Sequence, residues 1–66
     1  MQRETVLVEG EVIEVNEGAR TFRLKERPFD WFRFPHRSVR RLPVIGSWVR
    51  IQVTMERTVE RMVTMR

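Results

Sequence analysis

Short runs in which apolar and polar residues alternate recur along this chain, and each run has the length of a β-strand. The clearest run is residues 47–55, where one face would carry Val49, Ile51, Val53 and Met55. The other face of that run would carry Trp48, Arg50, Gln52 and Thr54. A period of two predicts a strand with one buried and one exposed face.

Four other segments predict strands because they are rich in Val, Ile, Phe or Trp: residues 5–15, 21–25, 29–34 and 59–65. In the first of them, Gly10 predicts a bulge or a sharp bend, because an isolated glycine weakens a regular strand. In the second, Phe22 and Leu24 alternate with basic residues, so we expect both side chains to point inward.

Turn signals separate these segments at residues 16–18, 26–28 and 56–58. Residues 36–42 are short and basic and allow at most one helical turn, because Pro43 follows closely. Five short strands predict an all-β protein with a single domain over residues 1–66. Closure would remove exposed strand edges, so we expect a small five-stranded OB-fold-like barrel, with an SH3-like barrel as the alternative.

Positive charge and aromatic rings are concentrated in the same stretch of the chain. The net charge is +4, and twelve of the thirteen basic residues are Arg. An Arg-rich composition is equally typical of a high-temperature source, so the position of the charge is more informative than its amount. Residues 20–41 hold eight basic and two acidic side chains, and five of the six aromatic residues lie in residues 22–34. Rings that stack on bases beside cations that contact phosphates are typical of single-strand-binding proteins.

Several short motifs also occur in the order found in a group of small RNA-binding barrels. Gly10-Glu11-Val12 resembles the Gly-x-Val of their first strand, and His36-Arg37-Ser38 resembles the His-x-Ser that follows their third. Residues 21–24, 46–53 and 61–63 are similar to their second, fourth and closing strands. The chain thus resembles cold-shock domains, bacterial translation initiation factor one and S-one-type RNA-binding domains. This resemblance implies a barrel that binds single-stranded RNA, or the ribosome, across its second and third strands.

The third strand carries four aromatic side chains, which alternation divides between its two faces. Phe29 and Trp31 would point one way, and Phe32 and Phe34 the other. One face of a barrel strand belongs to the core, so one pair lies outside, and exposed rings favour a binding partner. The resemblance at the His-x-Ser motif favours Phe32, Phe34 and His36 outward, with Trp31 inward.

We therefore expect the binding surface on the second and third strands and on the basic segment that follows them. The candidate nucleic-acid-binding residues are Arg23, Lys25, Trp31, Phe32, Arg33, Phe34, His36, Arg37, Arg40, Arg41 and Trp48. Trp48 is either a further stacking ring or a residue that packs beneath a loop. The expected ligand is single-stranded or loop RNA, including ribosomal RNA, with single-stranded DNA as an alternative.

Residues suited to catalysis or to metal binding are sparse. The chain has one His, one Asp, two Ser and no Cys or Tyr, so a nucleophile with a base and an orienting partner is not expected. His36 has no companion His or Cys with which to hold a metal. Glu9 and Glu11 would share a face, either solvated or paired with Arg across a strand. We expect no enzymatic activity and no cofactor.

The polar residues 1–5 and the short apolar runs after them predict a cytoplasmic protein without a signal peptide or membrane span. The competing hypothesis is a protein–protein interaction module that docks on a larger assembly such as a polymerase or the ribosome. Trp, Phe and Arg are also enriched at such interfaces. Salt dependence separates the two hypotheses, because phosphate contacts weaken steeply with added salt. The sequence does not determine the oligomeric state.

Overall fold

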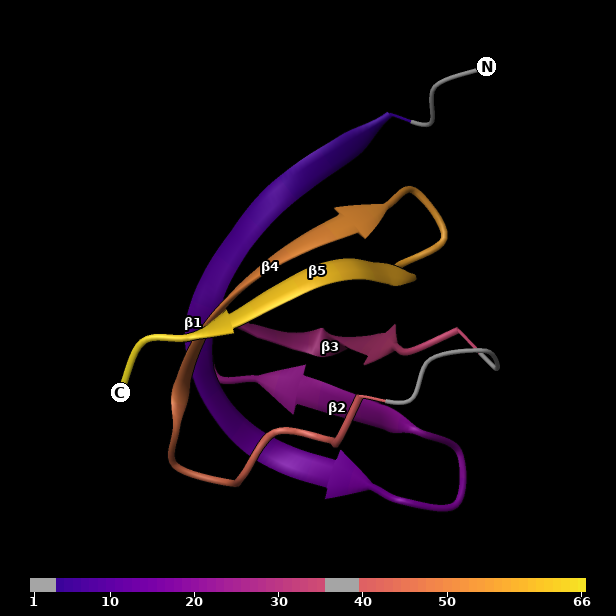
Figure 1. Cartoon of the computed structure of the whole chain (residues 1–66). Helices are drawn as coiled ribbons and strands as arrows, with labels where there is room; N and C mark the ends of the chain where they lie inside the picture. Colours follow the sequence, from indigo (N-terminus) through magenta and orange to yellow (C-terminus); the bar gives the residue numbers. More distant parts are fainter. Residues whose placement is uncertain (1–3, 36–39) are drawn as a thin grey trace.

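The computed structural model describes residues 4–35 and 40–66, and it shows one sheet of five antiparallel β-strands. The order of the strands across the sheet is β3-β2-β1-β4-β5 (Figure 1). The strands are β1 (Thr5–Asn16), β2 (Thr21–Leu24), β3 (Arg27–Arg33), β4 (Trp48–Thr54) and β5 (Val59–Thr64). The predicted all-β fold of five strands is thereby confirmed.

Helices play no part in the described portion of the fold. Its residues form no helix, and so none that is long and apolar enough to cross a membrane. The helical turn that the sequence allowed before β4 is absent from residues 40–47. The rest of that segment, residues 36–39, lies outside the described part of the chain.

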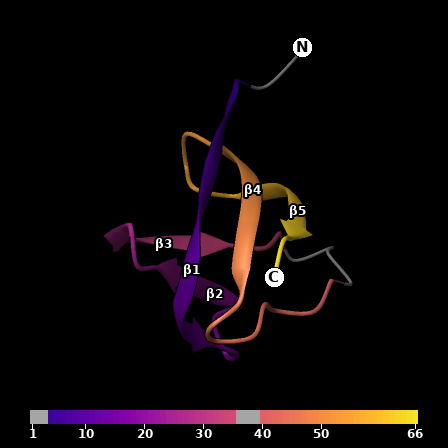
Figure 2. The same ribbon diagram turned by 90° about the vertical axis from the view of Figure 1, so that its left-hand side faces the viewer.

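β1 is a long, curved strand that changes partner along its length. Residues 5–11 pair with β4, and residues 12–16 pair with β2. The register with β2 shifts between Val12 and Glu14, whereas Gly10 is paired regularly with Val49, so the irregularity predicted at Gly10 lies a little further along the strand. Because β1 bends through this region, β2 and β3 are turned away from the direction of β4, and Figure 2 shows β3 crossing behind β1 and β4.

Gly10 allows the segment after β2 to approach β1 closely. A Cβ atom at this position would overlap Glu26 Oε1 and would lie 3.4 Å from the Leu24 Cβ. The same Glu26 oxygen accepts a hydrogen bond of 3.1 Å from the Glu11 N–H. Lys25 N–H donates to the Glu11 carbonyl oxygen at 2.8 Å. The glycine therefore makes room for a carboxylate that satisfies a backbone donor where β1 changes partner.

All five strands contribute to one hydrophobic core. Phe22 is fully buried, and its ring centroid lies 5.9 Å from that of Phe32 and 5.7 Å from that of Phe34. The other buried apolar residues are Val8, Val12, Leu24, Val49, Ile51, Val53 and Val59. The inward positions predicted for β2 and β4 are confirmed, except that Met55 follows β4 in a turn and is 81% exposed.

The orientation predicted for the aromatic residues of β3 is wrong. Phe32 and Phe34 are 2% and 3% exposed, whereas Phe29 is 95% and Trp31 38% exposed. The reason is the pairing with β2, in which Phe32 is the direct partner of Phe22. Opposed residues of antiparallel strands point to the same face, so Phe32 joins Phe22 in the core. Alternation then turns Phe29 and Trp31 outward.

The end of β3 is tied to two turns that belong to other parts of the sheet. Arg33 N–H donates to the Arg57 carbonyl oxygen at 2.9 Å, and Phe34 N–H donates to the Arg20 carbonyl oxygen at 3.1 Å. A parallel bridge between Arg33 and Thr58 brings β3 next to the start of β5, although these strands are at opposite ends of the strand order. Both turn arginines have positive φ, 56° at Arg20 and 64° at Arg57.

The close approach at Gly10 predicts a coupled effect on stability. Gly10→Ala should lower the free energy of unfolding by about 1 kcal/mol, because the new methyl group displaces the Glu26 carboxylate from the Glu11 N–H. In a Glu26→Ala background, Gly10→Ala should lower the free energy of unfolding by less, because the carboxylate that would overlap the new methyl group is no longer present. Urea denaturation of the wild type, both single variants and the double variant measures this coupling. Additive effects would show that glycine and carboxylate act independently.

Candidate functional site

The outward side chains of β2 and β3, together with the turn before β5, line an open depression of about 420 Å³. We call this surface the β2–β3 face. The residues that line it are Thr21 from β2, Phe29, Trp31 and Arg33 from β3, and Glu56 and Arg57 from the turn. The contact of Arg33 with the turn, described above, is what brings the two segments together.

Two aromatic rings stand on this face, two residues apart on β3. Phe29 is almost fully exposed, and Trp31 is partly covered. Residues at positions i and i+2 of a strand lie about 6.7 Å apart. The pair can therefore offer stacking surface to a flat, unsaturated ligand.

Arg23 of β2 lies over the Trp31 ring. Its guanidinium carbon is 5.0 Å from the ring centre, which is a cation–π distance. Its Nη1 donates to the Pro28 carbonyl oxygen at 2.8 Å, and its Nη2 pairs with Glu14 Oε1. These contacts fix the guanidinium, so the role of Arg23 on this face is to hold the indole in place.

The other charged residues of the face differ in how fully they are paired. Arg57 Nε donates to Asp30 Oδ1 at 2.8 Å, and Arg27 Nη1 lies 4.0 Å from Asp30 Oδ2. Arg33 and Glu56 form no ion pair or side-chain hydrogen bond with any residue of the described ranges. The depression is therefore lined by one free guanidinium, one partly engaged guanidinium and one free carboxylate.

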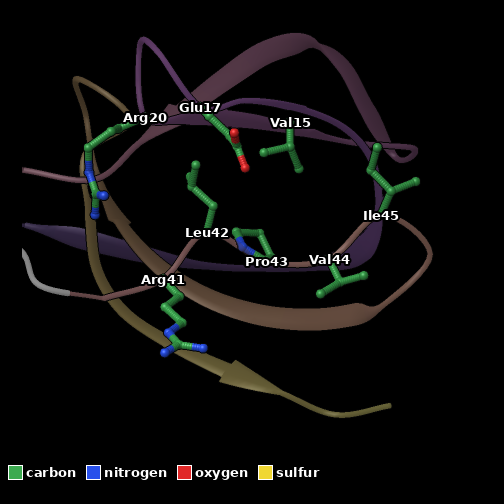
Figure 3. Close-up of a pocket in the computed structure, with 8 residues that line it drawn as sticks. All are labelled: Val15, Glu17, Arg20, Arg41, Leu42, Pro43, Val44 and Ile45. Atoms are coloured by element: carbon green, nitrogen blue, oxygen red, sulfur yellow. The ribbon is translucent and has the colours of Figure 1, made fainter.

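A second depression, of about 660 Å³, lies between the turn after β1 and the segment that leads to β4 (Figure 3). It is lined by Val15, Glu17, Arg20, Arg41, Leu42, Pro43, Val44 and Ile45. Figure 3 shows Arg20 and Arg41 toward one end, and Val44 and Ile45 toward the other. Arg20 Nη2 donates to the Arg40 carbonyl oxygen at 2.7 Å, so this guanidinium is engaged with the connecting segment.

Trp48 lies elsewhere, on the outer face of β4. Its Nε1–H donates to Glu9 Oε1 at 2.8 Å, and Arg50 Nε donates to Glu9 Oε2 at 3.1 Å. The hydrogen bond from Trp48 and, to a lesser extent, that from Arg50 lower the pKa of Glu9, because they stabilise its ionised form. The predicted pairing of Glu9 with an arginine across a strand is confirmed. The only polar group of the Trp48 side chain, its Nε1–H, is therefore already hydrogen-bonded to Glu9.

The predicted site residues are thus divided among several places. The β2–β3 face brings together Arg23, Trp31 and Arg33. The core takes two residues that were expected to stack on a ligand, Phe32 and Phe34. Connecting segments carry three exposed residues, Lys25, Arg40 and Arg41. Two predicted residues lie outside the described part of the chain, His36 and Arg37.

Four residues that line the face were not predicted as site residues: Thr21, Phe29, Glu56 and Arg57. Phe29 shares its side of β3 with Trp31, so alternation contained the signal once the outward face was known. Arg57 lies far from β3 in the sequence, and no pattern near it indicates that its turn meets the end of that strand. Only the tertiary structure places it here.

The two pairs of aromatic residues on β3 should differ in their effect on stability. Phe32→Ala should lower the free energy of unfolding by about 3–5 kcal/mol, because it empties a core position. Phe29→Ala should change it by less than about 0.5 kcal/mol, because that side chain is already in water. Urea denaturation followed by far-UV circular dichroism measures both. Similar losses in the two variants would mean that β3 does not face the core as described.

The Glu9–Trp48 contact predicts a pH-dependent signal. The folded-state pKa of Glu9 lies below the unfolded-state value of about 4.3. Ionised Glu9 therefore stabilises the fold above that pH, and the stabilisation is lost as the pH falls through the folded-state pKa. In a Trp31→Phe protein, Trp48 fluorescence should change over this acidic range. The same titration with Glu9→Gln added should be flat, and a persisting change would assign the signal to another carboxyl group.

Comparison with known proteins identified no relative. No protein-family model matches the chain, and no curated protein or solved structure is significantly similar to it. Within residues 4–35 and 40–66, no three His, Cys, Asp or Glu side chains are grouped so as to hold a metal ion. The chemistry of the β2–β3 face is therefore the main basis on which a function can be assigned.

Proposed function

We propose that the sheet closes into an OB-type barrel and that its β2–β3 face binds single-stranded or loop RNA, without catalysing a reaction. The strand order and the bridge between Arg33 and Thr58 support closure, because they join the two ends of the sheet. OB folds bind oligonucleotides on strands two and three, with the loops after strands one and four. The depression at Phe29 and Trp31 is built from β2, β3 and the turn after β4.

The exposed pair of Phe29 and Trp31 carries this proposal. An almost fully exposed Phe is unfavourable in water, and its place beside a second ring favours a ligand that covers both. Bases would stack on these rings, with a contribution of about 1–3 kcal/mol each. Because Arg23 holds the Trp31 indole in place, less side-chain entropy is lost on binding.

Arg33 and Arg57 are suited to the phosphates of the same strand. Arg33 is free of ion pairs with the described residues, and Arg57 engages Asp30 through Nε, which leaves its two Nη groups for a ligand. Each phosphate neutralised on a single strand adds about 0.7 to the slope of log affinity against log salt concentration. Two such contacts imply a clear but moderate salt dependence.

A second candidate function is docking to a protein through the outer side of β1, β4 and β5. Outward residues form two rows across these strands, Leu7–Gln52–Arg61 and Glu9–Arg50–Val63. Leu7 is 70% and Val63 56% exposed, and both line a depression with arginine side chains. Apolar residues beside arginine are typical of protein interfaces, and such binding would depend weakly on salt.

Fluorescence anisotropy tests the RNA proposal, with labelled mixed-sequence RNA and single-stranded DNA of about 12 nucleotides. We expect binding at micromolar or lower protein concentration that weakens as salt is raised from low to moderate. Phe29→Ala and Trp31→Ala should each weaken binding by about 1–3 kcal/mol, which is about five- to 150-fold. Circular dichroism would verify that both variants are folded.

Leu7→Ala is the matched control, since it removes an exposed apolar side chain from the outer side of β1, outside the β2–β3 face. Its affinity for RNA should equal that of the wild type. Unchanged affinity in both aromatic variants would exclude the β2–β3 face as the binding surface. Absence of binding even at low salt would overturn the RNA proposal and favour a protein partner.

A further inference from the structure

We propose that Glu56 makes the β2–β3 face selective for guanine, an inference that rests on the proposed binding of RNA. Glu56 is exposed in the turn between β4 and β5, and it is the acidic residue among those that line the depression with Phe29 and Trp31. Neither of its carboxylate oxygens has a partner among the described residues. It therefore presents two free acceptors beside the stacking surface.

A free carboxylate on this face works against phosphate binding. It stands with Arg33 and Arg57 around one depression, and its charge repels phosphate. Asp30 differs, because its charge is matched by Arg57 at 2.8 Å. Contacts to the RNA backbone thus give no reason for Glu56 to line the depression. Hydrogen bonds to the edge of a base would give such a reason, because an ionised carboxylate accepts hydrogen bonds at both oxygens.

Guanine is the RNA base whose Watson–Crick edge fits two acceptors at once. Its N1–H and N2–H₂ groups are adjacent donors, so both Glu56 oxygens can be used together. Adenine and cytosine place a ring-nitrogen acceptor beside their amino group, and uracil places a carbonyl on each side of its N–H. In those three bases a lone pair would face the carboxylate, which costs free energy.

The rest of the depression suits the same base. Guanine also carries the acceptors O6 and N7, for which Arg is the commonest partner. Arg33 and Arg57 both line the depression and supply such donors. A base stacked on Phe29 or Trp31 would have its edge in the same depression that Glu56 and these arginines line. Stacking would thus provide affinity, and the wall would provide selectivity.

The test uses uridine-rich RNA of about 12 nucleotides with one central guanine, adenine, cytosine or inosine. Inosine keeps N1–H and O6 but lacks the 2-amino group, so it isolates the second donor. The guanine probe should bind about five- to 150-fold more tightly than the adenine and cytosine probes, the range expected for one two-point contact to a base. The inosine probe should lose part of that advantage.

Glu56→Gln should abolish the preference for guanine, because an amide offers one acceptor in place of two. Its affinity for RNA that contains only uridine should be unchanged or slightly higher, since a negative charge has gone. Glu4→Gln is the matched control, because it makes the same charge change at an exposed position before β1, outside the depression. That variant should keep the preference for guanine.

Each other outcome has a distinct meaning. Equal affinity for the four probes would overturn the inference and leave RNA binding in place. A guanine preference that survives Glu56→Gln would also overturn it, since another residue would then select the base. Failure of the wild type to bind any probe would overturn the proposed function itself.

Discussion

The bend of β1 is the constraint on which the rest of this structure depends. One strand pairs with β4 over its first half and with β2 over its second, so its curvature decides how the two halves face each other. Gly10 leaves space near this bend for the Glu26 carboxylate, which accepts a hydrogen bond from the Glu11 N–H. A chain without cysteine has no disulfide to stabilise it, and the curved sheet lets all five strands share one core.

Core and candidate site are two sides of the same strand. The pairing of Phe22 with Phe32 assigns one side of β3 to the interior, and Phe29 and Trp31 are displayed on the other side as a consequence. A slip of one residue between β2 and β3 would exchange the two sets. The exposed rings are therefore held in position by the packing of Phe32 and Phe34, so a loss of core packing would also disturb the β2–β3 face.

The strands of this fold are predictable from alternation, but the face of β3 that is buried is not. Val49, Ile51 and Val53 alternate with polar residues, so one face of β4 had to be buried. Met55 continues that alternation in sequence, yet it is exposed because the chain turns after β4. On β3 both faces are aromatic, so alternation separates the pairs without saying which is inside. A local motif resemblance was a weaker guide there than the partner strand, which the sequence pattern does not specify.

Arg57 shows why the candidate site depends on tertiary structure. Its left-handed backbone, with φ 64°, costs a non-glycine residue about 1–2 kcal/mol. Its carbonyl oxygen would accept the Arg33 N–H equally well from a glycine, and its exposed ion pair with Asp30 contributes little on its own. Arg20 has a similar φ, but its guanidinium lies 5.7 Å from the Phe34 ring centre and supports the fold directly. The left-handed backbone of Arg57 belongs to the hairpin turn between β4 and β5, in which its N–H donates to the Thr54 carbonyl oxygen at 3.0 Å. The geometry of this turn, together with the bridge to the end of β3, is what brings the Arg57 guanidinium to the depression beside Phe29 and Trp31.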